Sequence, residues 1–234
     1  MAERISNYDL QVYEREILPN LPPEVVDAHV LLGLREHFRE VPSGGRATPE
    51  LRVRHHLTVQ GLFSNFKQIL QHRKRRFVVL PFSYREVDVG AANSYVAEST
   101  RRGSLRALVA LDGTNGASVR RLLERPGVVG AVVHLDFERG ASLRALDEDI
   151  LSLLIQKGGA LMVFPPWRGA AEEGAMGELL SLALRYPSLK IVLARVGGAL
   201  CPGAAERLVP ALAEAPNIYF DTALVTSHKV LEIL

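Results

Sequence analysis

Short, nearly continuous apolar runs recur along the chain, roughly every 30 residues after the first. Each run is rich in Val, Ile, Leu or Phe, and most end in Gly, Pro or Asp. This pattern is typical of strands in a sheet that is covered on both faces. We therefore predict strands at Val25–Leu32, Arg76–Phe82, Arg106–Gly113, Val128–Leu135, Gly159–Trp167, Lys190–Gly198 and Asn217–Leu224.

The stretches between these runs have the amphipathic pattern of helices, and several end at Gly or Pro. Predicted helices cover residues 89–103, 117–127, 146–159, 173–187, 204–216 and 225–234. Strand–helix–strand units of this length form right-handed parallel crossovers, so seven predicted strands favour an α/β fold, a (β/α) barrel of the TIM type. An open doubly wound sheet is the alternative, but it calls for a Gly-rich phosphate turn after an early strand, and the sequence has none.

We predict a single barrel domain over residues 1–234. Two features interrupt the regular spacing of its strands along the sequence. Residues 33–72 follow the first strand (22–32), and we predict an inserted loop over the barrel mouth, with a short helix around Ser64–Gln71. After the seventh strand no eighth strand is visible, which leaves unpaired backbone on two edge strands. We expect either a homo- or hetero-oligomeric partner that covers this edge, or a shortened version of a longer chain.

Composition narrows the class of protein. Hydrophobic residues make up 47% of the 234 positions and charged residues 23%, as in ordinary globular domains. The net charge of +2 and one basic run at residues 72–76 give little support to nucleic-acid binding. No apolar run approaches the ~20 residues of a membrane-spanning helix. With one cysteine, Cys201, an internal disulfide is impossible, and we expect a cytoplasmic protein.

The first strand carries a recognisable motif. VVDAHVLLG resembles the opening strand of the amidohydrolase-related family, a branch of the metal-dependent hydrolases, whose usual form is Asp-x-His-x-His. LPFSYREVDVGAANSYVAEST is similar to that family's second strand, loop and helix, YPSLKIVLARVGG to its sixth strand, and APNIYFDTAL to its seventh. The resemblance covers nearly the whole chain in order, and it implies a barrel with hydrolase or decarboxylase chemistry at a metal.

The family's metal ligands are mostly absent from the matching positions. His29 matches the first histidine, but Leu31 stands at the second. Phe164 stands where the fifth strand usually has a histidine, and Arg195 stands where the sixth has one. The aspartate of an eighth strand has no counterpart. Because catalytic zinc typically needs about three protein ligands, His29 is only a remnant, and we expect no resident cofactor.

Other polar residues offer alternatives to the lost ligands. His134 ends the fourth strand and Asp221 lies in the seventh, so both can face the mouth beside His29. One hypothesis is a rebuilt zinc or manganese site from these residues. Another is metal-free catalysis, with His29 or His134 as general base. The pair His55–His56 can also reach the mouth from the inserted loop.

Arg195 suggests binding of an anion. A guanidinium group has a planar fork that suits a carboxylate or a phosphate. With Trp167 and Arg168 on the rim after the fifth strand, Arg195 is predicted to bind a small anionic molecule. The alternative is that Arg195 pairs with Asp27 or Asp221 and neutralises the pocket.

Three functional hypotheses follow. The chain is a non-catalytic amidohydrolase-like protein that binds an anion, or a hydrolase or lyase that works without metal or with a rebuilt site, or a partial barrel completed by a partner. The substrate is not predicted, because specificity in such barrels lies in loops that vary on a common scaffold.

Overall fold

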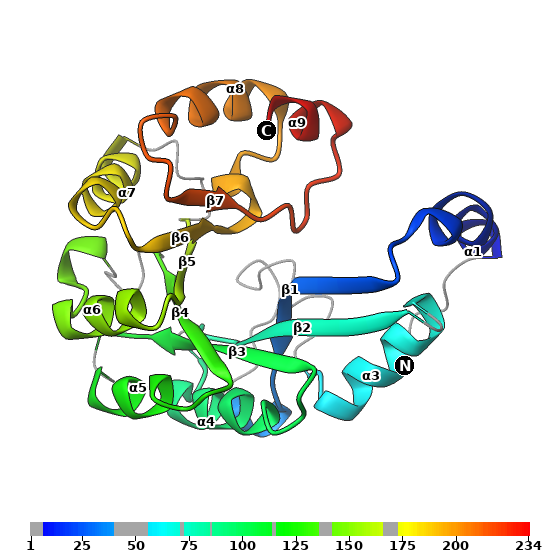
Figure 1. Ribbon diagram of the computed structural model, residues 1–234, viewed down its shortest axis with the longest axis horizontal. Helices are drawn as coiled ribbons and strands as arrows, with labels where there is room; N and C mark the ends of the chain where they lie inside the picture. The colour runs from blue at the N-terminus through cyan, green and yellow to red at the C-terminus, as the bar shows by residue number, and fades with distance from the viewer. Residues whose placement is uncertain are drawn as a thin grey trace.

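The computed structural model describes residues 7–39, 56–70, 73–84, 86–113, 116–135, 142–165 and 173–234. Within these residues, seven parallel strands form one sheet in the sequential order β1 to β7. The strands are β1 Glu24–Leu32, β2 Lys74–Pro81, β3 Leu105–Leu111, β4 Val128–His134, β5 Ala160–Phe164, β6 Lys190–Leu193 and β7 Ile218–Phe220. The sheet curls into an incomplete barrel, with β1 and β7 as its two edges (Figure 1). This confirms the predicted barrel and rejects the doubly wound alternative, since no strand order reverses.

Helices cover the outer face of the curled sheet (Figure 1). A helix follows each strand: α3 Val59–Leu70, α4 Val89–Ser99, α5 Gly116–Leu123, α6 Glu148–Gln156, α7 Glu173–Arg185, α8 Pro202–Ala211 and α9 His228–Ile233. Before β1 lie α1 Asn7–Val12, the π-helical turn η1 Tyr13–Ile17 and the 3-10 turn η2 Leu18–Asn20. Further short turns are η3 Arg35–His37, η5 Leu143–Ala145 and η6 Ala194–Gly198. Within the described residues, none of these helices has the length and apolar character needed to cross a membrane.

The strands pack an apolar layer on each face, which explains their nearly continuous apolar sequences. Side chains on the outer face pack under the helices in one large cluster, which includes Val79, Val109, Val133, Val163 and Leu193. Side chains of alternate positions form a second cluster inside the barrel, which includes Leu80, Leu108, Val132, Met162 and Phe164. The interior is therefore a packed core, and polar chemistry is confined to the carboxyl ends of the strands.

The segment between β1 and β2, where an inserted loop with a short helix is predicted over residues 33–72, contains a helix that is longer than expected. Its second half is α3, which begins at Val59, earlier than the expected start at Ser64. Phe63 and Phe66 of α3 pack against Phe77 of β2, with ring centroids 5.8 and 4.9 Å apart. The amphipathic helix thus covers the sheet as an ordinary crossover helix. Part of the remaining segment, residues 40–55, lies outside the described residues.

Candidate functional site

A β-bulge in the first strand sets the position of His29. Asp27 lies opposite Phe77 of β2, whereas Val30 lies opposite Val79, so the register shifts at Ala28 and His29. A bulge leaves a backbone group without its ladder partner and re-aims a side chain. The carboxylate of Asp27 accepts the backbone N–H of His29 at 3.1 Å. Asp27 therefore stabilises the bulge that carries His29, a role that the sequence pattern did not indicate.

His29 and Asp221 form a direct contact between the two edges of the sheet. The Nδ1 atom of His29 lies 2.7 Å from the Oδ2 atom of Asp221, directly after β7, and the two side chains are 12% and 11% exposed. The other carboxylate oxygen, Oδ1, accepts the backbone N–H groups of Arg195 at 3.0 Å and Ala223 at 2.8 Å. Asp221 is thus the centre of a small network that joins β1, β6 and β7.

The network keeps Asp221 ionised. Burial raises the pKa of its carboxyl group, but the hydrogen bond and charge of His29 and the two backbone N–H donors outweigh burial, so the pKa lies below its ordinary value. An ionised Asp221 accepts a hydrogen bond from Nδ1–H of His29. This interaction selects the tautomer in which the Nε2 atom of a neutral His29 has its lone pair available.

The turn after β6 has an unusual backbone. Arg195 (φ 56°), Val196 (φ 51°) and Gly197 (φ 63°) all adopt left-handed conformations. Such values are costly for a β-branched residue such as Val196, so the surrounding contacts must impose them. Besides the bond from the N–H of Arg195, the N–H of Val196 donates to the backbone oxygen of Asp221 at 2.8 Å. Gly197 and Gly198 signal a turn in the sequence, but nothing local predicts this conformation of Arg195 and Val196.

The buried ring of Phe164 lies at the centre of the mouth. His134 stacks on it, with centroids 4.1 Å apart and planes inclined by 13°. His29 contacts it edge-on at 5.1 Å, and Cζ of Arg195 lies over it at 5.2 Å. The structure therefore brings His29, His134, Asp221 and Arg195 to one place. It builds them around an aromatic side chain that sequence reasoning had treated only as a lost ligand.

This arrangement does not fit a divalent metal. Within the described residues, no group of three or more His, Cys, Asp and Glu side chains is placed to hold a metal ion. Nδ1 of His29 is engaged by Asp221, and His134 is packed on the face of Phe164. The described residues thus do not assemble the hypothetical site of His29, His134 and Asp221 around a common point, and we derive no chemistry through a metal.

The remaining predicted site residues are placed only in part. Trp167, Arg168 and His55 lie outside the described residues. His56 is exposed, and its Nδ1 accepts the backbone N–H of Arg35 at 3.1 Å, so its ring supports the segment before α3. For Arg195, Asp221 contacts the backbone N–H. Pairing between the guanidinium and an aspartate stays a prediction.

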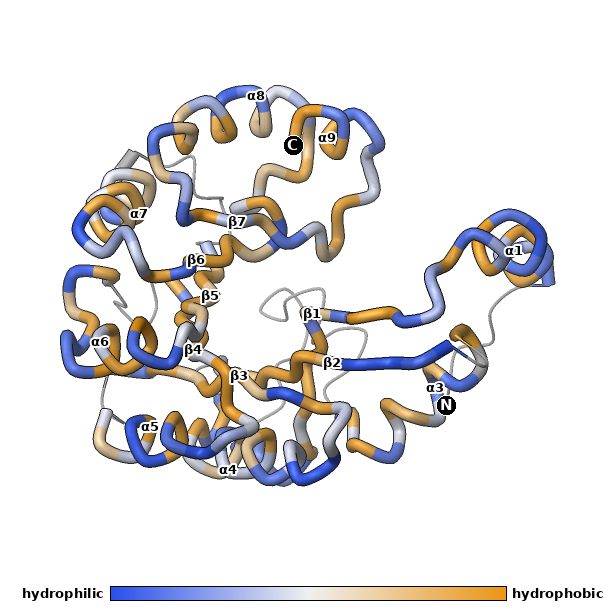
Figure 2. Tube along the Cα trace, viewed as in Figure 1, coloured by the Kyte–Doolittle hydropathy of each residue, from blue (hydrophilic) through white to orange (hydrophobic). Residues whose placement is uncertain are grey.

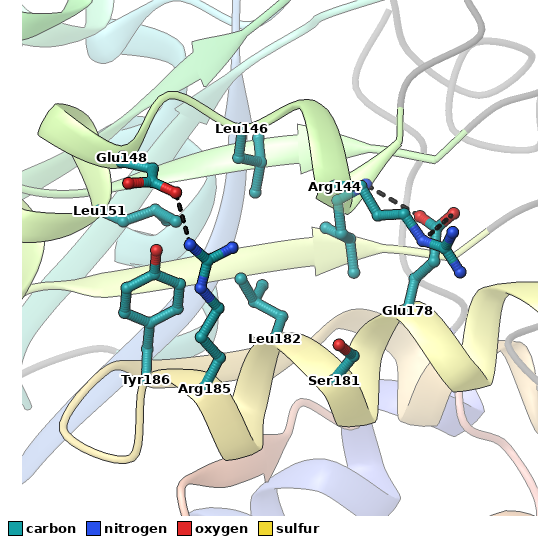
Figure 3. Close-up of a pocket in the computed structure, with 10 residues that line it drawn as sticks. Arg144, Leu146, Glu148, Leu151, Glu178, Ser181, Leu182, Arg185 and Tyr186 are labelled. Atoms are coloured by element: carbon teal, nitrogen blue, oxygen red, sulfur yellow. Dashed lines mark hydrogen bonds and ion pairs between the residues drawn. The ribbon is translucent and has the colours of Figure 1, made fainter.

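An open surface pocket lies away from the mouth. It has a volume of about 320 Å³ and lies between α6 and α7 on the outside of the barrel (Figure 3). Its floor is apolar, and ion pairs cross its two ends: Arg185 with Glu148 at 2.6 Å and Arg144 with Glu178 at 3.5 Å. Each of these guanidinium groups has a carboxylate partner, so little positive charge is left in this cavity to attract an anion.

Comparisons with known proteins place the fold. No family profile and no curated protein matches the chain. Among solved structures, it is similar to a 5-carboxyvanillate decarboxylase from Novosphingobium aromaticivorans in complex with manganese and 4-hydroxy-3-methoxy-5-nitrobenzoic acid, with TM-score 0.58 and 14% identity over 89% of this chain and 81% of that one.

Two further structures agree. The 5-carboxyvanillate decarboxylase from Sphingomonas paucimobilis matches with TM-score 0.55 and 16% identity over 91% of this chain and 84% of that one. An amidohydrolase 2 from Bifidobacterium longum subsp. infantis matches with TM-score 0.52 and 17% identity, over 84% of this chain and 71% of that one. Identities this low show the fold alone. The resemblance predicted from the sequence is confirmed at that level: the chain has the curled, parallel (β/α) barrel fold of the amidohydrolase 2 proteins.

Proposed function

We propose that the mouth of this barrel binds a small anionic molecule without a metal, with Arg195 as its main cationic contact. The observation that carries the proposal is the position of Arg195 over Phe164, at 5.2 Å from the ring centroid. His29 and His134 contact the same ring, so both imidazoles lie beside the guanidinium group, and Asp221 is engaged by His29. An apolar ring beneath a guanidinium group lowers the local dielectric constant and strengthens its attraction for an anion.

The backbone supports this role of Arg195. Its N–H is bonded to the carboxylate of Asp221, and the N–H of the next residue is bonded to the Asp221 backbone. The Cα of Arg195 is therefore fixed, and binding needs to order only the side chain. A planar guanidinium group favours planar, bidentate anions, so we expect carboxylates to bind more tightly than halide ions.

Isothermal titration calorimetry with benzoate, phthalate, malonate and inorganic phosphate tests the proposal. Arg195→Ala should weaken the tightest of these complexes by about tenfold or more, and Arg195→Lys should restore only part of the affinity. Arg185→Ala is the matched control, because Arg185 lies on the outside of the barrel in an ion pair with Glu148. Equal affinity of wild type and Arg195→Ala for every anion would reject the proposal.

A second candidate function is hydrolase or lyase chemistry without metal. The contact of 2.7 Å between His29 and Asp221 favours it, because a carboxylate that orients an imidazole is the usual support of a general base. In this candidate, Nε2 of His29 removes a proton from water or substrate, and Asp221 stabilises the imidazolium that forms.

Activity toward simple carboxylate esters and lactones, measured with and without EDTA, tests this second candidate. We expect turnover that survives EDTA and falls by about 100-fold or more in His29→Ala. Asp221→Asn should lower kcat more than it raises KM, because it changes the orientation and basicity of the imidazole. Turnover that is unchanged in His29→Ala would exclude His29 as the base.

A further inference from the structure

The residues before β1 form a projecting arm, defined here as residues 7–20. It comprises α1, η1 and η2, and it extends away from the curled sheet (Figure 1). None of its residues is buried, and Tyr8, Leu10 and Ile17 expose large apolar side chains, Tyr8 to 73%. Hydrogen bonds attach the arm to the barrel: the hydroxyl of Tyr13 donates to the backbone oxygen of Ile69, and Arg73 donates to that of Leu18.

A second exposed apolar surface lies on the open edge, defined here as β1 and β7. Within the described residues, β1 pairs only with β2 and β7 only with β6, so the outer side of each lacks a neighbouring strand. Val26 of β1 is 58% exposed and Tyr219 of β7 is 51% exposed. Figure 2 shows apolar stretches on both the arm and the adjoining part of β1. Unpaired edges with apolar side chains favour association with another polypeptide.

The arm and the neighbouring strand start carry opposite charges. The arm contains the carboxylates Asp9, Glu14 and Glu16 and a single cation, Arg15, which pairs with Glu16 at 2.5 Å. Residues 73–76 at the start of β2 are all cationic, and Glu24 of β1 pairs with both Lys74 and Arg76. Among the described residues, Glu24 is the carboxylate that forms ion pairs with this run, so the start of β2, beside the open edge, keeps a positive surplus there.

We propose that a second copy of this chain covers the open edge, with the arm of each copy lying across the edge of the other. The arm is apolar and acidic, whereas the edge is apolar and bordered by cations, so one chain carries both complementary surfaces. The arm and the open edge adjoin each other in one copy. A two-fold axis between two copies therefore places the arm of each copy on the edge of the other, so that both contacts form together. In this dimer, the partner that covers the barrel edge is a second copy of the chain. The proposal is independent of both functions proposed for the mouth.

Sedimentation velocity of the full chain, over a range of protein and salt concentrations, tests the dimer. We expect a dimer that weakens as salt rises, because the charge contacts are screened. Tyr8→Asp combined with Ile17→Asp should raise the dissociation constant by about tenfold or more. Leu184→Asp is the matched control, since Leu184 is 60% exposed but lies on α7, away from the edge; it should leave association unchanged.

Exchanging charges between the arm and the start of β2 distinguishes a loss of the proposed contact from a general loss of solubility. Glu14→Lys with Glu16→Lys should weaken the dimer, and adding Lys74→Glu to the same chain should restore part of the affinity. Circular dichroism confirms that each variant is folded. A wild-type monomer at high protein concentration, a dimer insensitive to the arm substitutions, or a monomer that holds a different protein at the edge would each overturn the proposal.

Discussion

The middle of the sheet and its two edges are built differently. Strands β3 to β5 have neighbours on both sides, and most of their side chains are buried on both faces. In β1 and β7, by contrast, most side chains are only partly buried, and each strand has one neighbour. Two polar residues of the site lie at the edges, since His29 is in β1 and Asp221 directly follows β7, whereas His134 ends the middle strand β4.

Because of this difference, the middle strands contribute mainly to the stability of the fold, and the edge strands contribute the ionisable pair of the site. The middle strands gain free energy from apolar burial, and the polar side chain that β4 contributes to the site, His134, lies at its last residue and stacks on Phe164. The edges bury less, so they tolerate a carboxylate and an imidazole, provided that the two groups pair. The contact between His29 and Asp221 also joins two strands that no backbone hydrogen bond connects. The site and the closure of the curled sheet therefore depend on the same pair.

The largest expected effect concerns the middle of the sheet. Leu161 of β5 is fully buried in the outer core cluster. Leu161→Ala should lower the free energy of unfolding by about 2–5 kcal/mol, because it removes buried surface and leaves a cavity. Urea unfolding monitored by circular dichroism measures the change. A loss below about 1 kcal/mol would mean that the middle strands are less tightly packed than the structure shows.

The next effect concerns the contact between the edges. Asp221→Asn removes the charge that pairs with His29, while the amide can still accept one backbone N–H. We expect a loss of about 2 kcal/mol in the free energy of unfolding, since a buried polar network is left partly satisfied. Asp149→Asn is the matched control, because Asp149 is exposed and pairs with Arg120 at 3.3 Å. Equal losses in the two variants would show that the pair does not close the sheet.

Acid should lower the stability of the fold in two stages, the first through His37 of η3 and the second through Asp221 after β7. Burial lowers the pKa of His37 below its ordinary value of 6.5, and its Nδ1 accepts the backbone N–H of Leu34 at 3.3 Å. The folded state thus favours neutral His37, and its contribution to stability is lost as pH falls below 6.5. The pKa of Asp221 is also lowered, so its contribution is present above its ordinary value of 3.8 and is lost as pH falls through the folded value.

Urea unfolding at a series of pH values between 7.5 and 3 checks these stages. His37→Asn should flatten the upper stage, since an amide oxygen can accept the N–H of Leu34 without titrating. Asp221→Asn should flatten the lower stage. If the wild type were equally stable at pH 7 and pH 5, the assigned role of His37 would be wrong.

The smallest effect is expected at the outer side of β1. Val26→Ala removes an exposed side chain, so the free energy of unfolding of the monomer should change by less than about 0.5 kcal/mol. The same substitution should weaken the proposed dimer. A large loss of monomer stability, measured in dilute solution, would show that Val26 is covered within one chain.

Some of the site was predictable and some was not. His29, His134, Asp221 and Arg195 were all expected near the mouth. His29 and Arg195 stand at ligand positions of the resembled family, His134 ends the fourth predicted strand, and Asp221 lies in the seventh. Their mutual contacts were not predictable. His29 and Asp221 are 192 positions apart, and a bulge in β1, supported by Asp27, shifts the register at His29.

The sequence by itself determined the order of strands and helices and the barrel class, because apolar periodicity is a local property that burial on two faces requires. It also showed that Leu31, Phe164 and Arg195 replace histidines of the resembled family. Only the tertiary structure decided that Phe164 packs between His134, His29 and Arg195, that Asp221 imposes a left-handed turn at Arg195, and that α3 is a covering helix. These features depend on the curl of the whole sheet, which brings distant residues together and leaves no signature in any short stretch of sequence.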